Sequence, residues 1–318
     1  MQPVAILLAT YNGGKYIEEF LISLQGQTFQ NYICYIHDDG SRDRTRRIAE
    51  EFVKRDPGHF QILEGPSQGG AKENFLWMLG QIEAEFYMFA DQDDVWLPEK
   101  IEKSVRTITE KKEGPQAGEE AGPLCVFTDM YVTDEKLRVM SDSFIRYIGR
   151  DPHRIKFSQV VIDNPAAGCT MIFTRKLRDM AIQLKHPKRV EMHDIWVLAL
   201  AAACGEQCIR VLDEPLVYYR QHGDNEMGAF SESFLEKIKR NARDVLSGNM
   251  AREKREFVQK ARILAGELCL VEGLPEKNRK ILKAFSEIGE KGKLTRVLFY
   301  RKYDFSRNRG TIWMYLWV

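Results

Sequence analysis

Short apolar runs alternate with segments of helical period along the first 110 residues. Four runs are apolar and rich in β-branched or aromatic side chains, which favours buried strands: 4–9, 32–36, 60–63 and 86–90. The segments between them repeat apolar residues every three or four positions, as in Ile17, Phe20, Leu21 and Leu24. Because each run is joined to the next segment by a short polar turn, the pattern predicts a parallel sheet with right-handed crossovers.

The second part of the chain has a different pattern of polar and apolar residues. Residues 111–123 are polar and rich in Gly and Pro, which predicts an exposed loop. Four further strands and one buried helix at 195–203 are expected beyond it, the strands at 124–127, 168–173, 209–212 and 216–219. Long helical patterns begin near residue 231.

These patterns predict an α/β fold in which a doubly wound, mostly parallel sheet is followed by a helical carboxyl-terminal extension. We expect one catalytic domain over residues 1–228, with a nucleotide-binding half at 1–110 and an acceptor-side half at 124–228. Residues 229–318 are expected to form a separate helical, basic region.

Composition places the chain among ordinary globular proteins, with 44% hydrophobic and 29% charged residues. Its six cysteines form no Cys-x-x-Cys pair, which argues against a zinc site or a disulfide framework and favours a reducing, cytoplasmic setting. The apolar run at 4–9 is too short to span a bilayer and is expected to be the first strand rather than a signal peptide.

Charge is distributed unevenly along the chain. Residues 231–318 hold 20 Lys and Arg against 11 Asp and Glu, whereas residues 1–230 hold 27 against 35. The segment 291–309 carries seven basic residues with Asp304 as its single acid, and an aromatic, aliphatic end follows at 311–318. This combination suits the anionic inner face of a bacterial plasma membrane, although a solvated helix with a core-docking end explains it equally well.

The most informative stretch places three carboxylates, Asp91, Asp93 and Asp94, directly after the strand at 86–90. Carboxylates at such close spacing repel one another, and a divalent cation offsets that repulsion. The loop follows the carboxyl end of a strand, where open α/β sheets bind ligands. Because the chain contains neither GxGxxG after the first strand nor GxxxxGK[ST], dinucleotide and P-loop sites are disfavoured.

Five short motifs carry a family resemblance, and they occur in this order: Thr10-Tyr11-Asn12, Asp38-Asp39-Gly40-Ser41, Asp91-Gln92-Asp93-Asp94, His193-Asp194 and Tyr219-Arg220-Gln221-His222. Together they resemble a family 2 glycosyltransferase of GT-A fold, in particular its rhamnosyltransferase-like branch. The resemblance covers about residues 3–225. It implies Asp194 as the catalytic base, Asp93 and His222 as ligands of Mg²⁺ or Mn²⁺, and the following donor-binding residues: Thr10, Tyr11, Asn12, Asp39, Asp91 and Gln92.

Structural alternatives exist for several of these residues. Asp39 could shape a turn, Asp194 could cap the helix that follows it, and His222 could be a structural histidine. We interpret His193 as an orienting or structural residue. Sequence alone leaves these alternatives open.

The resemblance implies an inverting, metal-dependent transfer of one sugar from a nucleotide diphosphate donor to a hydroxyl of a polysaccharide or lipid-linked glycan. L-Rhamnose from a dTDP donor is the expected sugar, with a UDP-sugar as the alternative. The chain lacks the Gln-x-x-Arg-Trp motif of processive synthases, which favours single transfer. A metal-dependent phosphoesterase and a catalytically silent nucleotide-sugar-binding module are the less favoured alternatives.

Overall fold

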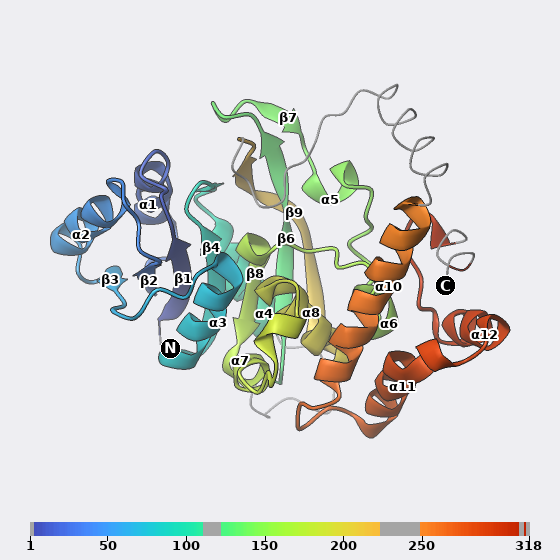
Figure 1. Cartoon of the computed structure of the whole chain (residues 1–318). Helices are drawn as coiled ribbons and strands as arrows, with labels where there is room; N and C mark the ends of the chain where they lie inside the picture. Colours follow the sequence, from blue (N-terminus) through green and yellow to red (C-terminus); the bar gives the residue numbers. More distant parts are fainter. Residues whose placement is uncertain (1–2, 111–121, 223–248, 312–314, 316–318) are drawn as a thin grey trace.

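The computed structural model describes residues 3–110, 122–222, 249–311 and 315. Within these residues nine strands form one sheet in the order β3-β2-β1-β4-β8-β6-β9-β5, with β7 paired to β6 (Figure 1). The strands are β1 (Val4–Thr10), β2 (Tyr32–Asp38), β3 (Phe60–Ile62), β4 (Phe86–Asp91), β5 (Val95–Trp96), β6 (Cys125–Thr133), β7 (Val139–Ser141), β8 (Met171–Thr174) and β9 (Ile209–Arg220).

The first four strands pair in parallel, as the alternation of strands and helices predicts. β1 lies between β2 and β4, and β3 flanks β2. The sheet continues through β8, which is antiparallel to β4 and to β6, and β9 returns parallel to β6. One mixed sheet therefore runs through both predicted halves of the catalytic domain.

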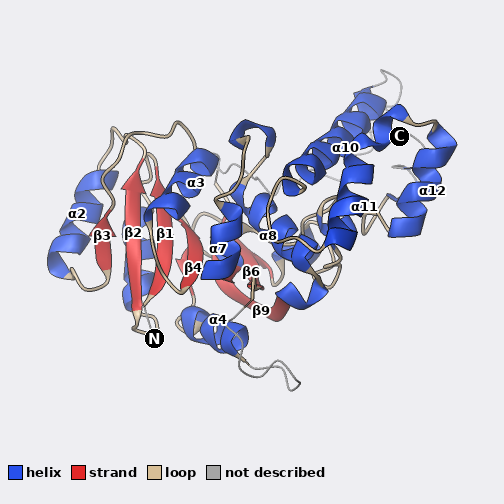
Figure 2. Ribbon diagram, turned by 90° about the horizontal axis from the view of Figure 1, so that it is seen from below, coloured by secondary structure: helices blue, strands red, loops and turns tan. Residues whose placement is uncertain are grey.

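Helices cover both faces of the sheet, which explains why the central strands β1 and β4 are apolar at every position but the last. In β4, Tyr87 and Phe89 belong to one hydrophobic cluster, whereas Phe86, Met88 and Ala90 belong to the other. Figure 2 shows α3, α7 and α8 on one face and α4 on the opposite face. These helices are α3 (Ala71–Gln81), α4 (Lys100–Thr109), α7 (Arg175–Ala181) and α8 (His193–Cys204), and α1 (Ile17–Gln25) and α2 (Thr45–Arg55) flank the first strands.

Short elements depart from the sequence predictions. The strand expected at 168–173 begins as a 3₁₀ turn, η1 (Gly168–Thr170), and only then becomes β8. The two strands expected at 209–212 and 216–219 are one strand, β9, with a register shift where Pro215 faces Asp129. Small elements that the patterns did not indicate include β5, β7, α5 (Phe144–Tyr147), α6 (Phe157–Val160), η2 (Pro187–Arg189) and η3 (Glu206–Cys208).

Helices of the carboxyl-terminal region pack onto the catalytic fold. They are α10 (Asn249–Leu268), α11 (Glu276–Glu287), η4 (Ile288–Glu290) and α12 (Lys293–Tyr303). Leu264 and Leu268 of α10, with Phe285 of α11, belong to the same hydrophobic cluster as Trp196 and Leu200 of α8. The loop expected at 111–123 lies almost entirely outside the described residues, as does the predicted boundary at 228.

None of the helices within the described ranges combines the length and the apolarity that crossing a membrane requires.

Candidate active site

The candidate site lies where the carboxyl ends of β1, β2 and β4 meet the end of β9 and the start of α8. The loops after β1 and β2 are joined by hydrogen bonds. Thr10 Oγ1 donates to Asp38 Oδ1 at 2.9 Å, and the backbone N–H of Asn12 donates to Ser41 Oγ at 2.8 Å. Asn12 Oδ1 accepts from the backbone N–H of Arg42 at 2.9 Å while Asn12 itself has a left-handed φ of 46°. These hydrogen bonds join the Thr10–Asn12 turn to the loop after β2.

Gln92 holds this turn to the acidic loop. Its Oε1 accepts from the backbone N–H of Tyr11 at 3.1 Å, and its Nε2 donates to the backbone oxygen of Tyr11 at 2.9 Å. A Cβ at Gly13 would lie 2.0 Å from Gln92 Oε1, so glycine leaves the space that this side chain occupies. The Tyr11 side chain is 57% exposed and is open to a ligand. The donor-binding role expected for Gln92 remains a prediction beside this positioning role.

Asp39 is nearly buried, and both of its carboxylate oxygens already accept hydrogen bonds. The donors are Ser67 Oγ at 2.8 Å and the backbone N–H groups of Gln68, Gly69 and Gly70, the last at 2.9 Å. The carboxylate thereby shapes the loop that leads into α3, a structural role that the sequence allowed. Contact with the donor base remains a prediction.

The acidic loop after β4 brings the two predicted metal ligands together. His222 Nε2 lies 2.7 Å from Asp93 Oδ2, although the two residues are 129 positions apart. The imidazole stacks on Tyr16, with ring centroids 4.8 Å apart. Carboxylate oxygens and a neutral imidazole suit Mn²⁺, and carboxylates suit Mg²⁺, so this pair fits a divalent cation.

A second acidic group lies deeper in the protein. Oxygen atoms of Asp91 and Asp94 and the sulfur of Cys169 all lie within 4.8 Å of one another. Burial, followed by the negative charges of Asp93 and Asp91, raises the pKa of Asp94 well above its ordinary value. Burial also raises the pKa of the Cys169 thiol, which therefore stays protonated and is a poor ligand for a hard cation. Asp93 with His222 remains the predicted cation site.

Lys100 supplies a buried positive charge behind this loop. Its ammonium group lies 4.3 Å from the centre of the Trp96 ring and interacts electrostatically with Asp94. Burial lowers the pKa of Lys100 to about 8. None of the five sequence motifs includes this lysine.

Asp194 occupies the first turn of α8 rather than the capping position, which belongs to Met192. Its Oδ2 accepts from the backbone N–H of Gly168 at 3.1 Å, and its Oδ1 accepts from the backbone N–H of Ile195 at 2.7 Å. The carboxylate thus links α8 to η1, which packs against β4. The alternative that Asp194 caps this helix is therefore wrong.

Burial raises the pKa of Asp194 to about 6, and the two backbone hydrogen bonds and the positive charge of Arg150 limit the rise. A carboxylate with this pKa is ionised at neutral pH and is basic enough to accept a proton from a reacting hydroxyl. The site therefore contains a carboxylate suited to general base catalysis, which is bonded to η1, and Cys169 of η1 lies near Asp91 and Asp94.

The neighbouring His193 is a structural residue, in agreement with its interpretation from the sequence. Its ring is buried between Phe75 and Phe89, at centroid distances of 4.1 and 4.5 Å. Burial lowers the pKa of His193 to about 3, so the imidazole is neutral. A Cβ at Gly168 would lie 2.9 Å from His193 Nε2, which explains the glycine in η1.

The mixed sheet with helices on both faces and an acidic loop at the end of β4 has the architecture of a glycosyltransferase of GT-A fold. The model of the family "Glycosyl transferase family 2" matches residues 5–176, more than half of the chain. The chain therefore belongs to the family 2 glycosyltransferases.

Two curated relatives cover most of the chain. It is 27% identical over 244 residues to RfbG of Shigella flexneri, a dTDP-rhamnosyl transferase, a match that covers 73% of this chain and 77% of the relative. It is also 26% identical over 299 residues to EpsH of Bacillus subtilis (strain 168), a putative glycosyltransferase, with 90% and 82% covered.

Solved structures share the fold. The crystal structure of S. aureus TarS 1-349 aligns with a TM-score of 0.55 at 19% identity, covering 90% of this chain and 70% of that one. The mannosyltransferase PcManGT from Pyrobaculum calidifontis, in complex with GDP-Man and Mn²⁺, aligns with a TM-score of 0.52 at 16% identity, covering 96% and 74%.

Proposed function

We propose that this glycosyltransferase is metal-dependent and inverting, and that it transfers a single L-rhamnose from dTDP-rhamnose to a hydroxyl of a polysaccharide or lipid-linked glycan. The observation that carries the proposal is the contact between Asp93 Oδ2 and His222 Nε2, which lie 2.7 Å apart at the end of β4. Asp194 is bonded to Gly168 of η1, which packs against the same strand. The choice of donor is supported by the similarity to RfbG. The turn formed by Thr10, Tyr11 and Asn12 would line the nucleotide-binding site.

In the proposed reaction, Asp194 accepts the proton of the acceptor hydroxyl while the hydroxyl oxygen attacks the anomeric carbon of the donor sugar. The bond between the anomeric carbon and the diphosphate oxygen breaks, and its electron pair leaves with the nucleotide diphosphate. Attack opposite the leaving group inverts the anomeric configuration. A cation held by Asp93 and His222 would neutralise charge on the departing diphosphate.

A thermal-shift screen tests the donor and the metal together. Saturating dTDP-rhamnose with Mn²⁺ should raise the Tm, since a ligand at 100 times its Kd adds about 2.7 kcal/mol to the free energy of unfolding. UDP-sugars and GDP-mannose should give smaller shifts. A larger shift with a UDP-sugar would identify that donor class instead, and equal shifts with EDTA would contradict metal dependence.

Turnover separates the proposal from its less favoured alternatives. Transfer of rhamnose to a glycan acceptor supports it. Donor binding without transfer to any acceptor tested would favour a silent binding module, and hydrolysis of a generic phosphodiester would favour a phosphoesterase.

The exposed face of α12 supports a further part of the proposal, a peripheral contact with an anionic membrane at the inner face of the plasma membrane. Leu294 and Leu298 are 73% and 57% exposed and lie one helical turn apart. Exposed basic residues surround them: Lys291, Lys293, Arg301 and Lys302. Apolar side chains beside Lys and Arg are the elements by which a helix binds such a surface. Most of the aromatic end at 311–318 lies outside the described residues.

Replacing both Leu294 and Leu298 by Ser should weaken binding to vesicles of phosphatidylglycerol and phosphatidylcholine by about tenfold or more, since each leucine loses the free energy of leaving water. Co-sedimentation at low salt measures the loss. Ile182→Ser, at an exposed apolar position outside the basic region, is the control. Equal sedimentation of the double variant and the control would contradict a membrane contact through α12.

A further inference from the structure

Arg220, the last residue of β9, lies directly behind the pair formed by Asp93 and His222. Its side chain is almost fully enclosed, with 3% of the residue exposed. Its side chain therefore interacts mainly with protein groups.

On one side Arg220 holds the acidic loop. Its Nε donates to the backbone oxygen of Asp93 at 2.9 Å, and its backbone N–H donates to Asp94 Oδ1 at 3.4 Å. Because the first bond is to the backbone of Asp93, it fixes the point from which that carboxylate projects. It occupies neither carboxylate oxygen of Asp93, of which Oδ2 contacts His222.

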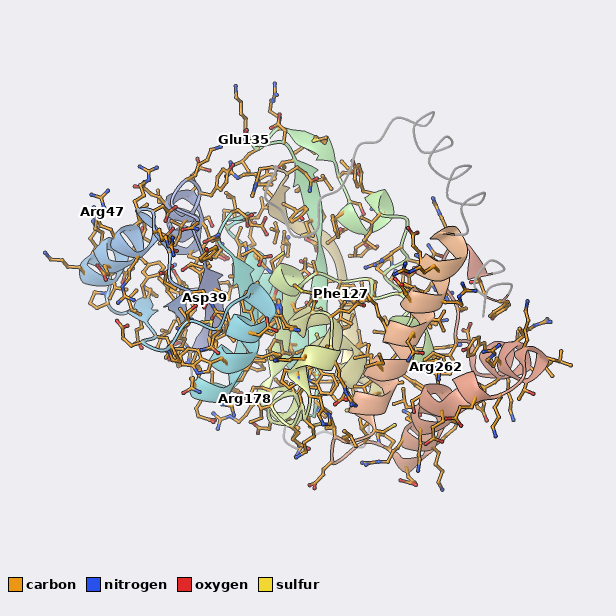
Figure 3. The ribbon with its side chains drawn as sticks, in the orientation of Figure 1. Asp39, Arg47, Phe127, Glu135, Arg178 and Arg262 are labelled. Carbon is orange, nitrogen blue, oxygen red and sulfur yellow. The ribbon has the colours of Figure 1, made fainter. Side chains whose placement is uncertain are left out.

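On the other side Arg220 contacts two distant segments. Its Nη1 donates to the backbone oxygen of Glu135 at 2.7 Å, and its Nη2 pairs with the carboxylate of Glu19 on α1. Glu135 lies in the turn between β6 and β7, at the upper edge of the molecule in Figure 3 and far from Arg178 of α7. Three separate parts of the chain thus converge on one guanidinium.

Tyr16 extends this contact to His222. The guanidinium of Arg220 lies 4.9 Å from the centre of the Tyr16 ring, and the same ring stacks on the imidazole of His222. The Tyr16 hydroxyl donates to Glu135 Oε1 at 3.0 Å, and Lys15 pairs with the same oxygen. Arg220 therefore supports Asp93 directly and His222 through Tyr16.

We propose that Arg220 is the positioning residue of the Asp93–His222 pair and that it sets the affinity of this pair for a divalent cation. The inference rests on the proposed function, since it takes the pair to be the cation site. The planar guanidinium fork carries five N–H donors and serves three acceptors in different directions. A lysine at this position keeps the charge but has a single nitrogen, so it cannot hold all three.

The test is Mn²⁺ binding to the full chain in the presence of dTDP, measured by isothermal titration calorimetry and by the electron paramagnetic resonance of free Mn²⁺. Arg220→Lys should raise the Kd for Mn²⁺ by about 10- to 100-fold, the range for partners that orient metal ligands. Saturating Mn²⁺ should restore much of kcat, whereas a general loss of folding would not be relieved by metal. Arg138→Lys, in an exposed ion pair of the same β6–β7 turn, should leave the Kd unchanged.

Two further variants keep the inference testable if Arg220→Lys fails to fold. Glu19→Gln removes the ionic partner of Nη2, and Tyr16→Leu removes the ring between Arg220 and His222; each should raise the Kd for Mn²⁺ by severalfold. A wild-type Kd in a folded Arg220→Lys protein, or in both of these variants, would overturn the inference. If the wild-type protein binds no Mn²⁺ with dTDP, the metal dependence in the proposed function fails and the inference fails with it.

Discussion

Replacing Asp194 by Asn should lower kcat by about 10²–10⁴-fold, the range that general base catalysis contributes, while donor binding stays within about twofold. The amide oxygen can accept from the backbone N–H of Gly168 and so keep the bond between α8 and η1, whereas the amide nitrogen cannot accept from the backbone N–H of Ile195. The amide cannot accept a proton from the acceptor hydroxyl. Single-turnover transfer of radiolabelled sugar measures the loss, and dTDP binding is measured in parallel.

The pH dependence of the same reaction provides an independent check. Because burial raises the pKa of Asp194 to about 6, wild-type kcat should fall as the pH drops through about 6. An exposed aspartate would lose its charge near pH 4. Asp194→Asn should lack this acidic limb in its residual rate.

The same pKa shift gives a stability prediction of known sign. A raised carboxyl pKa means that the ionised form is disfavoured in the folded protein, and this cost is fully present above pH 6 and absent below the ordinary pKa. As the pH falls from 7.5 to about 4, the free energy of unfolding of the wild type should therefore rise relative to that of Asp194→Asn, which loses one backbone hydrogen bond but has no carboxyl group to titrate. Asp213→Asn, at an exposed position of β9, is the control for both experiments. Wild-type turnover in Asp194→Asn would exclude Asp194 as the base.

The second large effect concerns the cation site. Asp93→Asn should lower kcat by about 10²–10³-fold, because a metal ion contributes several kcal/mol to stabilising charge in the transition state. The amide replaces an anionic ligand with a neutral one and removes the carboxylate that pairs with His222. The Kd for Mn²⁺ should rise together with the loss of rate. Titrating the wild type and Asp93→Asn with Mn²⁺, while recording both binding and turnover, measures the two effects.

A variant with a matched change of charge separates this effect from general electrostatics. Asp142→Asn removes an exposed carboxylate just after β7 and should leave both kcat and the Kd for Mn²⁺ unchanged. His222→Ala should weaken Mn²⁺ binding in the same direction as Asp93→Asn. Undiminished Mn²⁺ binding by both site variants would show that the cation binds elsewhere.

Much of the amino-terminal fold follows from the sequence because its physical causes are local. The strands β1 and β4 are covered on both faces and are therefore apolar up to their last residues, Thr10 and Asp91, and polar turns separate the strands from amphipathic helices. β5 and β7 have only two and three residues, too few for a period to appear. The polar segment Asp213-Glu214-Pro215 predicts the end of one strand and the start of another. β9 nevertheless continues through it, and its pairing with β6 shifts register there.

The candidate site was predictable where it depends on motifs and not where it depends on distant contacts. His222 and Asp93 meet as the family resemblance implies. Arg220 lies within a motif, but its partners Glu19 and Glu135 are 201 and 85 positions away in the sequence, and neither has a local signal. The hydrogen bonds that Asp39 accepts from residues 67–70 likewise depend on a loop whose path no pattern indicates.

The cluster that α10 and α11 share with α8 constrains how the enzyme can be re-engineered. Recombining glycosyltransferases at the end of β9 would pair one parent's α8 with another parent's carboxyl-terminal helices and so mismatch the side chains around Trp196 and Leu268. The helix that carries Asp194 would then rest on a poorly filled core. A chimaeric enzyme is better built by exchanging α8, α10 and α11 together, which keeps this cluster intact.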